Sequence, residues 1–132
     1  MSDAQPPNTE EPTNSPVQRV EAYLAAWNAH DGAAVVDEFA AGGTYVDPFL
    51  PGPLAGDNIA GYVTALATAM PDLAFTKEAI LATGNRVVLA WLMTGTYTGP
   101  LEGLPGPTGA TGELRGVDLI DVRPDGILSV VG

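Results

Sequence analysis

The stretch Thr44-Tyr45-Val46-Asp47-Pro48 predicts the first strand of the protein and places it between helical segments. Side chains along a strand alternate between its two faces, so Tyr45 and Asp47 are expected on the same face. Pro48 ends the strand because it has no backbone N–H to donate. Asp47 stands where an apolar residue would be expected, which makes it the first candidate for a polar site.

Upstream of this strand, the sequence predicts two helices. Ser15 supplies a capping side chain and Pro16 suits the first helical position. Apolar residues then recur at spacings of three and four, as on one face of a helix: Val17, Val20, Tyr23, Leu24 and Trp27. Residues 28–32 break this helix. Val35, Val36 and Phe39 predict the apolar face of a short second helix that ends at Gly42-Gly43.

Downstream, the pattern predicts a third helix and then a sheet. After the turn-rich residues 51–57, the helix is marked by Ile59, Val63, Leu66 and Met70, and Pro71-Asp72 closes it. The candidate strands are residues 74–82, 86–98, 113–123 and 127–131. The order helix, helix, strand, helix, strands indicates an α+β protein.

A Gly/Pro-rich segment, residues 99–112, separates two of these strands. Its composition predicts a loop at the rim of a pocket or at the tip of a hairpin. A phosphate-binding loop is disfavoured, because no lysine follows the glycines and no helix begins there.

The chain has 132 residues, of which 45% are hydrophobic, enough for one domain with one core. We expect this domain to cover residues 16–132. Residues 1–15 are rich in Pro, Asn, Thr, Ser and Glu and predict a solvated, disordered tail. They have neither the basic start nor the apolar core of a signal peptide, and no apolar run reaches about 18 residues. A cytoplasmic protein without a membrane span is therefore expected.

The charge balance excludes several classes of partner. With a net charge of −11 and five basic residues, the chain has no cationic surface for nucleic acid or acidic membranes. It has no cysteine for disulfides or thiol chemistry, and its single histidine makes a zinc site improbable. We expect neither a metal nor a cofactor.

Three polar residues interrupt apolar patterns: Tyr23, Asp47 and Asp118. Asp118 lies inside Val117-Asp118-Leu119-Ile120, where a carboxyl group costs several kcal/mol unless it is paired or neutral. Arg115 or Arg123 could pair with it from a neighbouring strand. The alternatives are structural, since Tyr23 could be an ordinary core tyrosine and Asp47 could belong to a strand-ending turn. Together, the three residues suggest a pocket that moves protons.

Other polar and aromatic residues support less specific predictions. His30, in the break between helices, is expected to be a solvent-exposed cap. Asp121 and Asp125 read as solvated charges. The aromatic residues Trp27, Phe49, Trp91 and Tyr97 are expected to be wall or core residues of a hydrophobic pocket.

Four motifs carry a resemblance to a known superfamily: Trp27-Asn28-Ala29-His30-Asp31, Tyr45-Val46-Asp47-Pro48, Pro71-Asp72-Leu73 and Gly95-Thr96-Tyr97-Thr98-Gly99. With the order of elements, they resemble the nuclear transport factor 2-like superfamily from Pro16 to the end. The resemblance implies a cone-shaped fold with three N-terminal helices packed on a curved, mostly antiparallel sheet around a buried pocket. It also implies a homodimer, since related sheets commonly pair through their outer face. Related sequences usually continue past the residues that match Val130-Val131-Gly132, and such a segment would complete the pocket or the dimer.

Within that superfamily, residues 17–48 resemble ketosteroid isomerase without a gap. Tyr23, Asp47 and Asp118 match its three catalytic positions. The resemblance implies that Asp47 is the base, that Tyr23 is the main donor to the enolate oxygen, and that Asp118 is a second donor kept neutral by its apolar neighbours. Val63 stands where that family has a tyrosine supporting the catalytic one, and Tyr62 is one position away.

Two other families resemble parts of the chain. Residues 99–112, Gly-Thr-Tyr-Thr-Gly and Pro-Asp-Leu look like the SnoaL-like polyketide cyclases, which close rings by aldol chemistry through an enolate and usually have histidine where Tyr97 stands. Limonene epoxide hydrolase is a third relative. Tyr45 and Asp47 match its water-holding pair, with Asp in place of Asn, but its arginine and aspartate strand is apolar here, around Ala90-Trp91-Leu92-Met93.

These observations predict a cofactor-independent isomerase or cyclase that acts through an enolate on a small apolar carbonyl compound. The alternative is a non-catalytic small-molecule-binding module of the same fold, or an aldol cyclase. The expected catalytic residues are Tyr23, Asp47 and Asp118. The expected substrate-binding residues are Trp27, Tyr45, Phe49, Tyr62, Trp91 and Tyr97.

Overall fold

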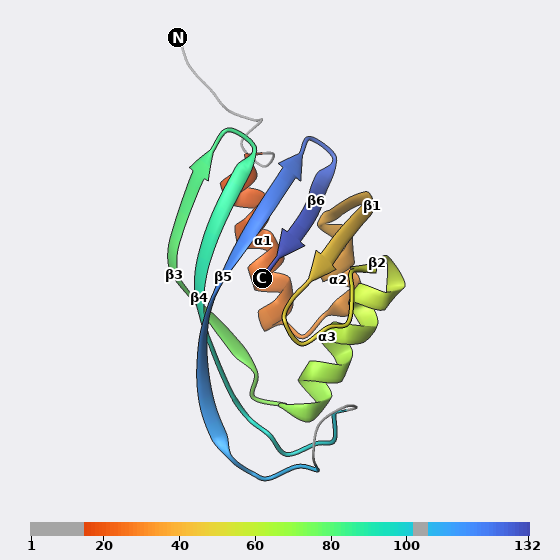
Figure 1. Cartoon of the computed structure of the whole chain (residues 1–132), viewed down its shortest axis with the longest axis vertical. Helices are drawn as coiled ribbons and strands as arrows, with labels where there is room; N and C mark the ends of the chain where they lie inside the picture. Colours follow the sequence, from red (N-terminus) through yellow and green to blue (C-terminus); the bar gives the residue numbers. More distant parts are fainter. Residues whose placement is uncertain (1–14, 102–105) are drawn as a thin grey trace.

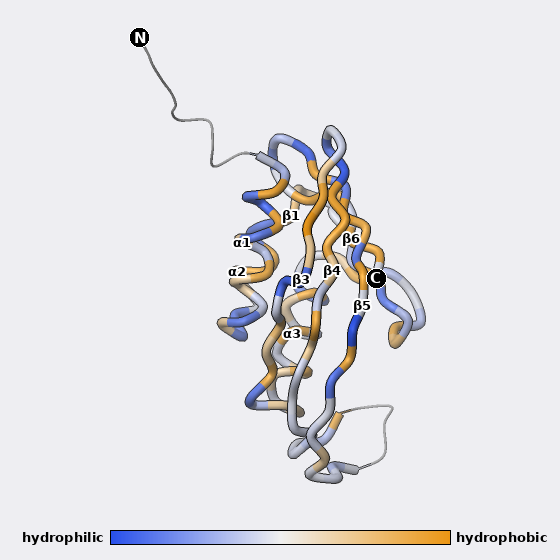
Figure 2. Tube along the Cα trace, turned by 90° about the vertical axis from the view of Figure 1, so that its left-hand side faces the viewer, coloured by the Kyte–Doolittle hydropathy of each residue, from blue (hydrophilic) through white to orange (hydrophobic). Residues whose placement is uncertain are grey.

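Three helices lie on one face of a six-stranded sheet in the computed structural model, which describes residues 15–101 and 106–132 (Figure 1, Figure 2). The elements are α1 (Pro16–Asn28), α2 (Gly32–Asp37), β1 (Phe39–Val46), β2 (Leu54–Ala55), α3 (Asp57–Ala69), β3 (Ala74–Thr83), β4 (Arg86–Thr96), β5 (Thr111–Arg123) and β6 (Gly126–Val131). The predicted tail, residues 1–15, lies outside the described residues except for Ser15. Among the described residues, every helix is too short or too polar to span a bilayer.

The strands follow the order β2-β1-β6-β5-β4-β3 across the sheet. Neighbours pair antiparallel except β1 and β6, which run parallel. The expected α+β class is thus confirmed, with a mixed sheet that is mostly antiparallel. The parallel pair joins the first strand to the last and brings the end of β1, where Asp47 follows, beside the end of β6 (Figure 1).

Helix α1 begins as the sequence predicts. The Ser15 hydroxyl accepts a hydrogen bond from the Gln18 N–H at 3.1 Å, and Pro16 occupies the start of the helix. The cap stabilises the first turn of the helix, and the apolar stripe decides which face of the helix meets the sheet. That face buries Val20, Tyr23 and Trp27, so Tyr23 points inward rather than to solvent.

The second helix is shorter in the structure than the sequence predicts. Helix α2 ends at Asp37 and β1 begins at Phe39, which pairs with Ile127 of β6. The strand then bulges between Phe39 and Thr44, where Gly42 adopts a positive φ of 78° that residues with a Cβ rarely take. Pairing with a distant strand therefore overrides the local helical pattern, and Gly42-Gly43 lie inside β1.

The break between α1 and α2 also differs from expectation. His30 is half-buried rather than an exposed cap, and its Nε2 lies 2.7 Å from the carbonyl oxygen of Leu73. This contact ties the turn after α1 to the segment before β3. Downstream, the predicted strands are confirmed to within two residues at each end.

The two faces of the sheet differ in burial. The inner face, toward the helices, carries buried residues such as Val87, Leu89 and Ile120. The outer face carries a row of exposed apolar residues that are cross-strand neighbours: Leu81, Val88, Leu119 and Val131. We call these four residues the outer apolar row.

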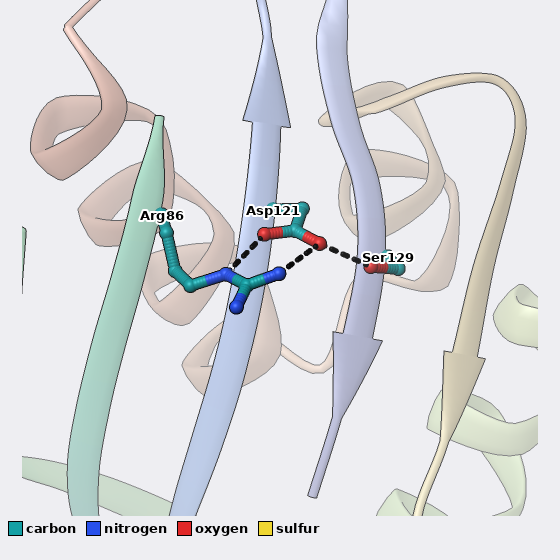
Figure 3. A network of polar contacts seen from close by, with 3 residues as sticks. All are labelled: Arg86, Asp121 and Ser129. Carbon is teal, nitrogen blue, oxygen red and sulfur yellow. Dashed lines mark hydrogen bonds and ion pairs between the residues drawn. The ribbon is translucent and has the colours of Figure 1, made fainter. Parts of the chain in front are cut away.

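A polar network borders the outer apolar row. Arg86 donates to both carboxylate oxygens of Asp121, at 2.8 and 3.2 Å, and the Ser129 hydroxyl donates to Asp121 at 3.5 Å (Figure 3). These side chains lie on three neighbouring strands with the helices behind the sheet (Figure 3). Asp121 is partly exposed, in keeping with the expected solvated charge, but it also forms an ion pair with Arg86, its cross-strand neighbour.

Candidate active site

A cavity of about 860 Å³ lies between the helices and the inner face of the sheet. Aromatic side chains from both layers line it: Tyr23, Trp27, Tyr45, Phe49, Tyr62, Phe75 and Trp91. Aliphatic side chains, Met70 and Met93 fill the spaces between these rings, and two carboxyl groups, Asp47 and Asp118, face the same space. An apolar cavity with a few converging polar groups is typical of a small-molecule site.

Asp47 is held by three hydrogen bonds. Its Oδ2 accepts from the Tyr45 hydroxyl at 2.9 Å and from the Tyr62 hydroxyl at 2.7 Å. Its Oδ1 accepts from the backbone N–H of Phe49 at 2.8 Å. The expectation that Tyr45 and Asp47 share a face is confirmed. In all three hydrogen bonds the Asp47 carboxyl group is the acceptor, so its two oxygens are held by donors from three residues.

Asp118 has a different environment. It lies on the inner face of β5 and is 7% exposed. Burial raises the pKa of Asp118 from 3.8 to about 6; a hydrogen bond from Trp91 opposes the rise and the negative charge of Asp47 adds to it. Arg115, a possible partner by sequence, instead donates to Glu78 at 3.0 Å. Asp118 therefore binds a proton far more readily than an exposed carboxyl group does.

Tyr23 brings a hydroxyl group from α1 to the same cavity. The residue is 2% exposed, and its ring packs edge-on against Phe39 with 5.8 Å between the ring centroids. Burial raises the pKa of Tyr23 well above its ordinary value of 10.0, and the nearby charge of Asp118 adds to this, whereas a hydrogen bond with Trp27 acts in the opposite direction. The phenol thus stays protonated near neutral pH.

The structure brings Tyr23, Asp47 and Asp118 to one cavity, although they come from three separate parts of the chain. A Cβ placed on Gly132 would lie 3.0 Å from Oδ1 of Asp118 and 3.4 Å from Cβ of Asp47. The two aspartates therefore flank the same residue. The Gly132 N–H donates to the Val46 carbonyl at 2.9 Å, which fixes Gly132 between them.

Of the six expected substrate-binding residues, five line this cavity: Trp27, Tyr45, Phe49, Tyr62 and Trp91. Phe49 is 71% exposed and so lies at the rim. Tyr97 is not brought together with them and lines a smaller neighbouring recess of about 200 Å³. The two spaces share Met70, Met93 and Leu114.

Several features of the site were not found from the sequence. Tyr62 donates to Asp47 itself, and Phe75 joins the aromatic wall, with its ring centroid 5.4 Å from that of Trp27 and 5.6 Å from that of Trp91. Part of the segment 99–112 lies outside the described residues, but Leu101 reaches the cavity. A two-residue alternation places Phe75 on one face of β3 but does not indicate that this face meets Trp27.

Within residues 15–101 and 106–132, no three acidic or histidine side chains lie close enough together to hold a metal ion.

The chain is similar to known proteins in both sequence and fold. The family model described as a SnoaL-like domain matches residues 20–130. No curated protein matches the chain.

Solved structures share the fold. A candidate polyketide cyclase from Xanthomonas campestris pv. campestris is 26% identical, with a TM-score of 0.73 over 88% of this chain and 87% of the other. IdmH from Streptomyces antibioticus, also a candidate polyketide cyclase, is 22% identical, with a TM-score of 0.75 over 89% of each chain. A protein of ketosteroid isomerase-like fold from Catenulispora acidiphila, in complex with trimethylamine, is 23% identical, with a TM-score of 0.72 over 86% of this chain and 82% of that one.

Proposed function

Because the chain belongs to the family of SnoaL-like domains, we propose that it is a cofactor-independent isomerase or cyclase acting through an enolate on a small apolar carbonyl compound. The observation that carries the proposal is the pair of carboxyl groups in one cavity with opposite environments. Asp47 is surrounded by donors, whereas burial raises the pKa of Asp118 to about 6. Two titratable groups in contrasting environments suit the separate roles of base and acid.

In the proposed reaction, the Asp47 carboxylate takes a proton from the carbon next to the substrate carbonyl. The electron pair of the broken C–H bond moves onto the carbonyl oxygen and makes an enolate. The Tyr23 hydroxyl donates a hydrogen bond to that oxygen, and Asp118 donates a second one in its protonated form, which its pKa of about 6 makes the main form below that pH. Donors already in place stabilise charge that develops only in the transition state.

The enolate then has two possible fates. In an isomerase, Asp47 returns the proton to a different carbon and the double bond shifts. In a cyclase, the enolate carbon attacks a second carbonyl group of the same molecule, a C–C bond forms, and the new alkoxide takes the proton. Both reactions need the same base and the same donors, so one site can support either.

The cavity walls favour an apolar substrate. Aromatic rings pack edge-on or tilted around Trp27, with centroid distances of 5.4 to 6.3 Å to Phe75, Tyr45 and Tyr62. Arg115 lines the cavity, but its guanidinium group pairs with Glu78. Selectivity for an apolar carbonyl compound follows from these walls, and reactivity from the polar groups between them.

The test is a spectrophotometric assay with a β,γ-unsaturated 3-ketosteroid, whose conversion to the conjugated ketone changes its ultraviolet absorbance. Asp47→Asn should lower turnover by about 10²- to 10⁴-fold, as expected for loss of a general base. Asp121→Asn, the same substitution on the outer face of the sheet, is the control and should retain activity. Full activity in Asp47→Asn would contradict the assignment of the base.

A non-catalytic binding module is the second candidate, and the three hydrogen bonds to Asp47 favour it, because they occupy three of the four acceptor sites of its carboxylate. In that case Asp47→Asn would leave steroid affinity nearly unchanged, and no turnover would occur in either protein. Steroid binding measured by quenching of tryptophan fluorescence, alongside the turnover assay, separates the two functions.

A further inference from the structure

We propose that Tyr45 and Tyr62 are positioning residues that hold the Asp47 carboxylate by one oxygen and leave its other oxygen to receive the substrate proton. This inference rests on the proposed role of Asp47 as the base. We call the two residues the tyrosine pair.

The hydrogen bonds to Asp47 are unevenly divided between its two oxygens. Each carboxylate oxygen has two acceptor sites. The tyrosine pair fills both sites of Oδ2, at 2.9 and 2.7 Å. Oδ1 accepts only the Phe49 N–H among the described hydrogen bonds, at 2.8 Å, which leaves one site free. Oδ1 is therefore the oxygen that can take a proton without displacing a donor.

The tyrosine pair is itself held by packing. Tyr45 comes from β1 and is 8% exposed, whereas Tyr62 comes from the middle of α3. Their ring centroids are 5.7 Å apart, and Trp27 packs against both at 6.2 and 6.3 Å. Because the donors stand on different elements, the carboxylate cannot rotate without losing a hydrogen bond to one of them.

Both hydroxyl groups remain donors over the working pH range. Burial raises the pKa of Tyr45 and of Tyr62 far above the ordinary tyrosine value, and the hydrogen bond to Asp47 and its charge raise the pKa of Tyr62 further. The other titratable groups that face Asp47 are Tyr23 from α1 and Asp118 from β5. The tyrosine pair thus provides permanent donors to a carboxylate that also faces a second acidic group.

Removal of the tyrosine pair should have a measurable effect on Asp47. Donors interact more strongly with a carboxylate than with a carboxylic acid, so each tyrosine opposes protonation of Asp47. Removing one hydroxyl should make Asp47 easier to protonate and free an acceptor site on Oδ2. The response of Asp47 to the loss of a hydroxyl is therefore a direct measure of how firmly the tyrosine pair holds this carboxylate.

The experiment follows the Asp47 carboxyl carbon by ¹³C NMR as a function of pH in the whole chain without substrate. In Tyr62→Phe the midpoint of this titration should move upward, and in Tyr45→Phe/Tyr62→Phe it should move further. Ser129→Ala is the matched control, because it removes a hydroxyl that donates to Asp121 on the outer face. An Asp47 midpoint in folded Tyr62→Phe that equals that of the control would overturn the inference.

A second readout separates this inference from the proposed function. If Asp47 is the base, the acid limb of the pH profile of kcat/KM should move upward in Tyr62→Phe by the same amount as the NMR midpoint. If the midpoint shifts but the protein shows no turnover, the tyrosine pair does hold Asp47. Only the proposed enzymatic function would then be overturned. An acid limb that stays in place while the midpoint moves would overturn the positioning of the base.

Discussion

The indole ring of Trp91 lies directly on Gly116, its cross-strand neighbour on β5, so closely that a Cβ on Gly116 would overlap the ring. Trp91 also donates a hydrogen bond to Asp118, two residues further along β5. The absence of a side chain at residue 116 therefore positions the ring that contacts a candidate catalytic residue.

Gly116→Ala should displace Trp91 and destabilise the fold by about 1–3 kcal/mol, the usual cost of overpacking a core. Urea denaturation followed by tryptophan fluorescence measures this. Gly112→Ala is the matched control, since it lies on the same strand and a Cβ there would meet no atom within 4 Å. Equal stability of the two variants would contradict the close packing of Trp91.

Asp118 should make the folded state less stable as pH rises, which is the opposite of the effect of most carboxyl groups. Its pKa is raised from 3.8 to about 6 on folding, so the folded state holds the proton more tightly than the unfolded state. The resulting stabilisation is complete below about pH 4 and is lost as pH rises through about 6. The loss amounts to at most about 3 kcal/mol, because one pKa unit corresponds to about 1.36 kcal/mol.

Unfolding free energies of wild type and Asp118→Asn, measured between pH 4 and 7, test this expectation. The difference between the two proteins isolates Asp118 from the other carboxyl groups. The stability of wild type relative to the variant should fall with rising pH, and a constant difference would contradict it.

Trp91→Phe should raise the pKa of Asp118 further, because the variant lacks the N–H donor that favours the ionised carboxylate. The pH range in which Asp118 destabilises the fold should then move upward. The same denaturation series measures this shift. A downward movement would show that Trp91 acts on Asp118 mainly by excluding water.

The outer apolar row should pair two copies of the chain. Leu81, Val88, Leu119 and Val131 form a continuous exposed line across four strands. The Arg86–Asp121 ion pair borders this line (Figure 3), and the Arg115–Glu78 ion pair lies further along β5. A line of apolar side chains bordered by charged pairs can match a rotated copy of itself.

We therefore expect a homodimer that Leu119→Lys converts to a monomer. Ala25→Lys, at an exposed residue of α1, adds the same charge elsewhere and should leave the dimer intact. Light scattering after size-exclusion chromatography gives the masses. A wild-type mass of 13.6 kDa would contradict the expectation.

Sequence periodicity predicted the elements whose pattern is local. The cap at Ser15, the alternation of Tyr45 and Asp47, and the third helix all follow from spacing within a few residues. The resemblance to the nuclear transport factor 2-like superfamily is confirmed by the SnoaL-like match over residues 20–130. The catalytic and substrate-binding roles of individual residues remain predictions.

What periodicity missed depends on contacts between distant parts of the chain. Phe39 fits a helical pattern but pairs with Ile127, and Asp121 reads as a free charge until β4 brings Arg86 beside it. The direction of Tyr62 is set by the packing of α3 against α2 and β2, which no local pattern encodes. These interactions decide how the polar groups of the cavity are arranged.

The parallel pairing of β1 with β6 has a consequence for the order in which the protein folds. Asp47 follows β1, but that strand finds its long neighbour only in residues synthesised more than 80 positions later. On the ribosome, α1 and α2 can form before β6 has been synthesised, and β1 is then still unpaired on that edge. The candidate active site should therefore be assembled only in the last step of folding, when β6 pairs with β1. Ligand binding would then occur only in molecules whose sheet is completely formed.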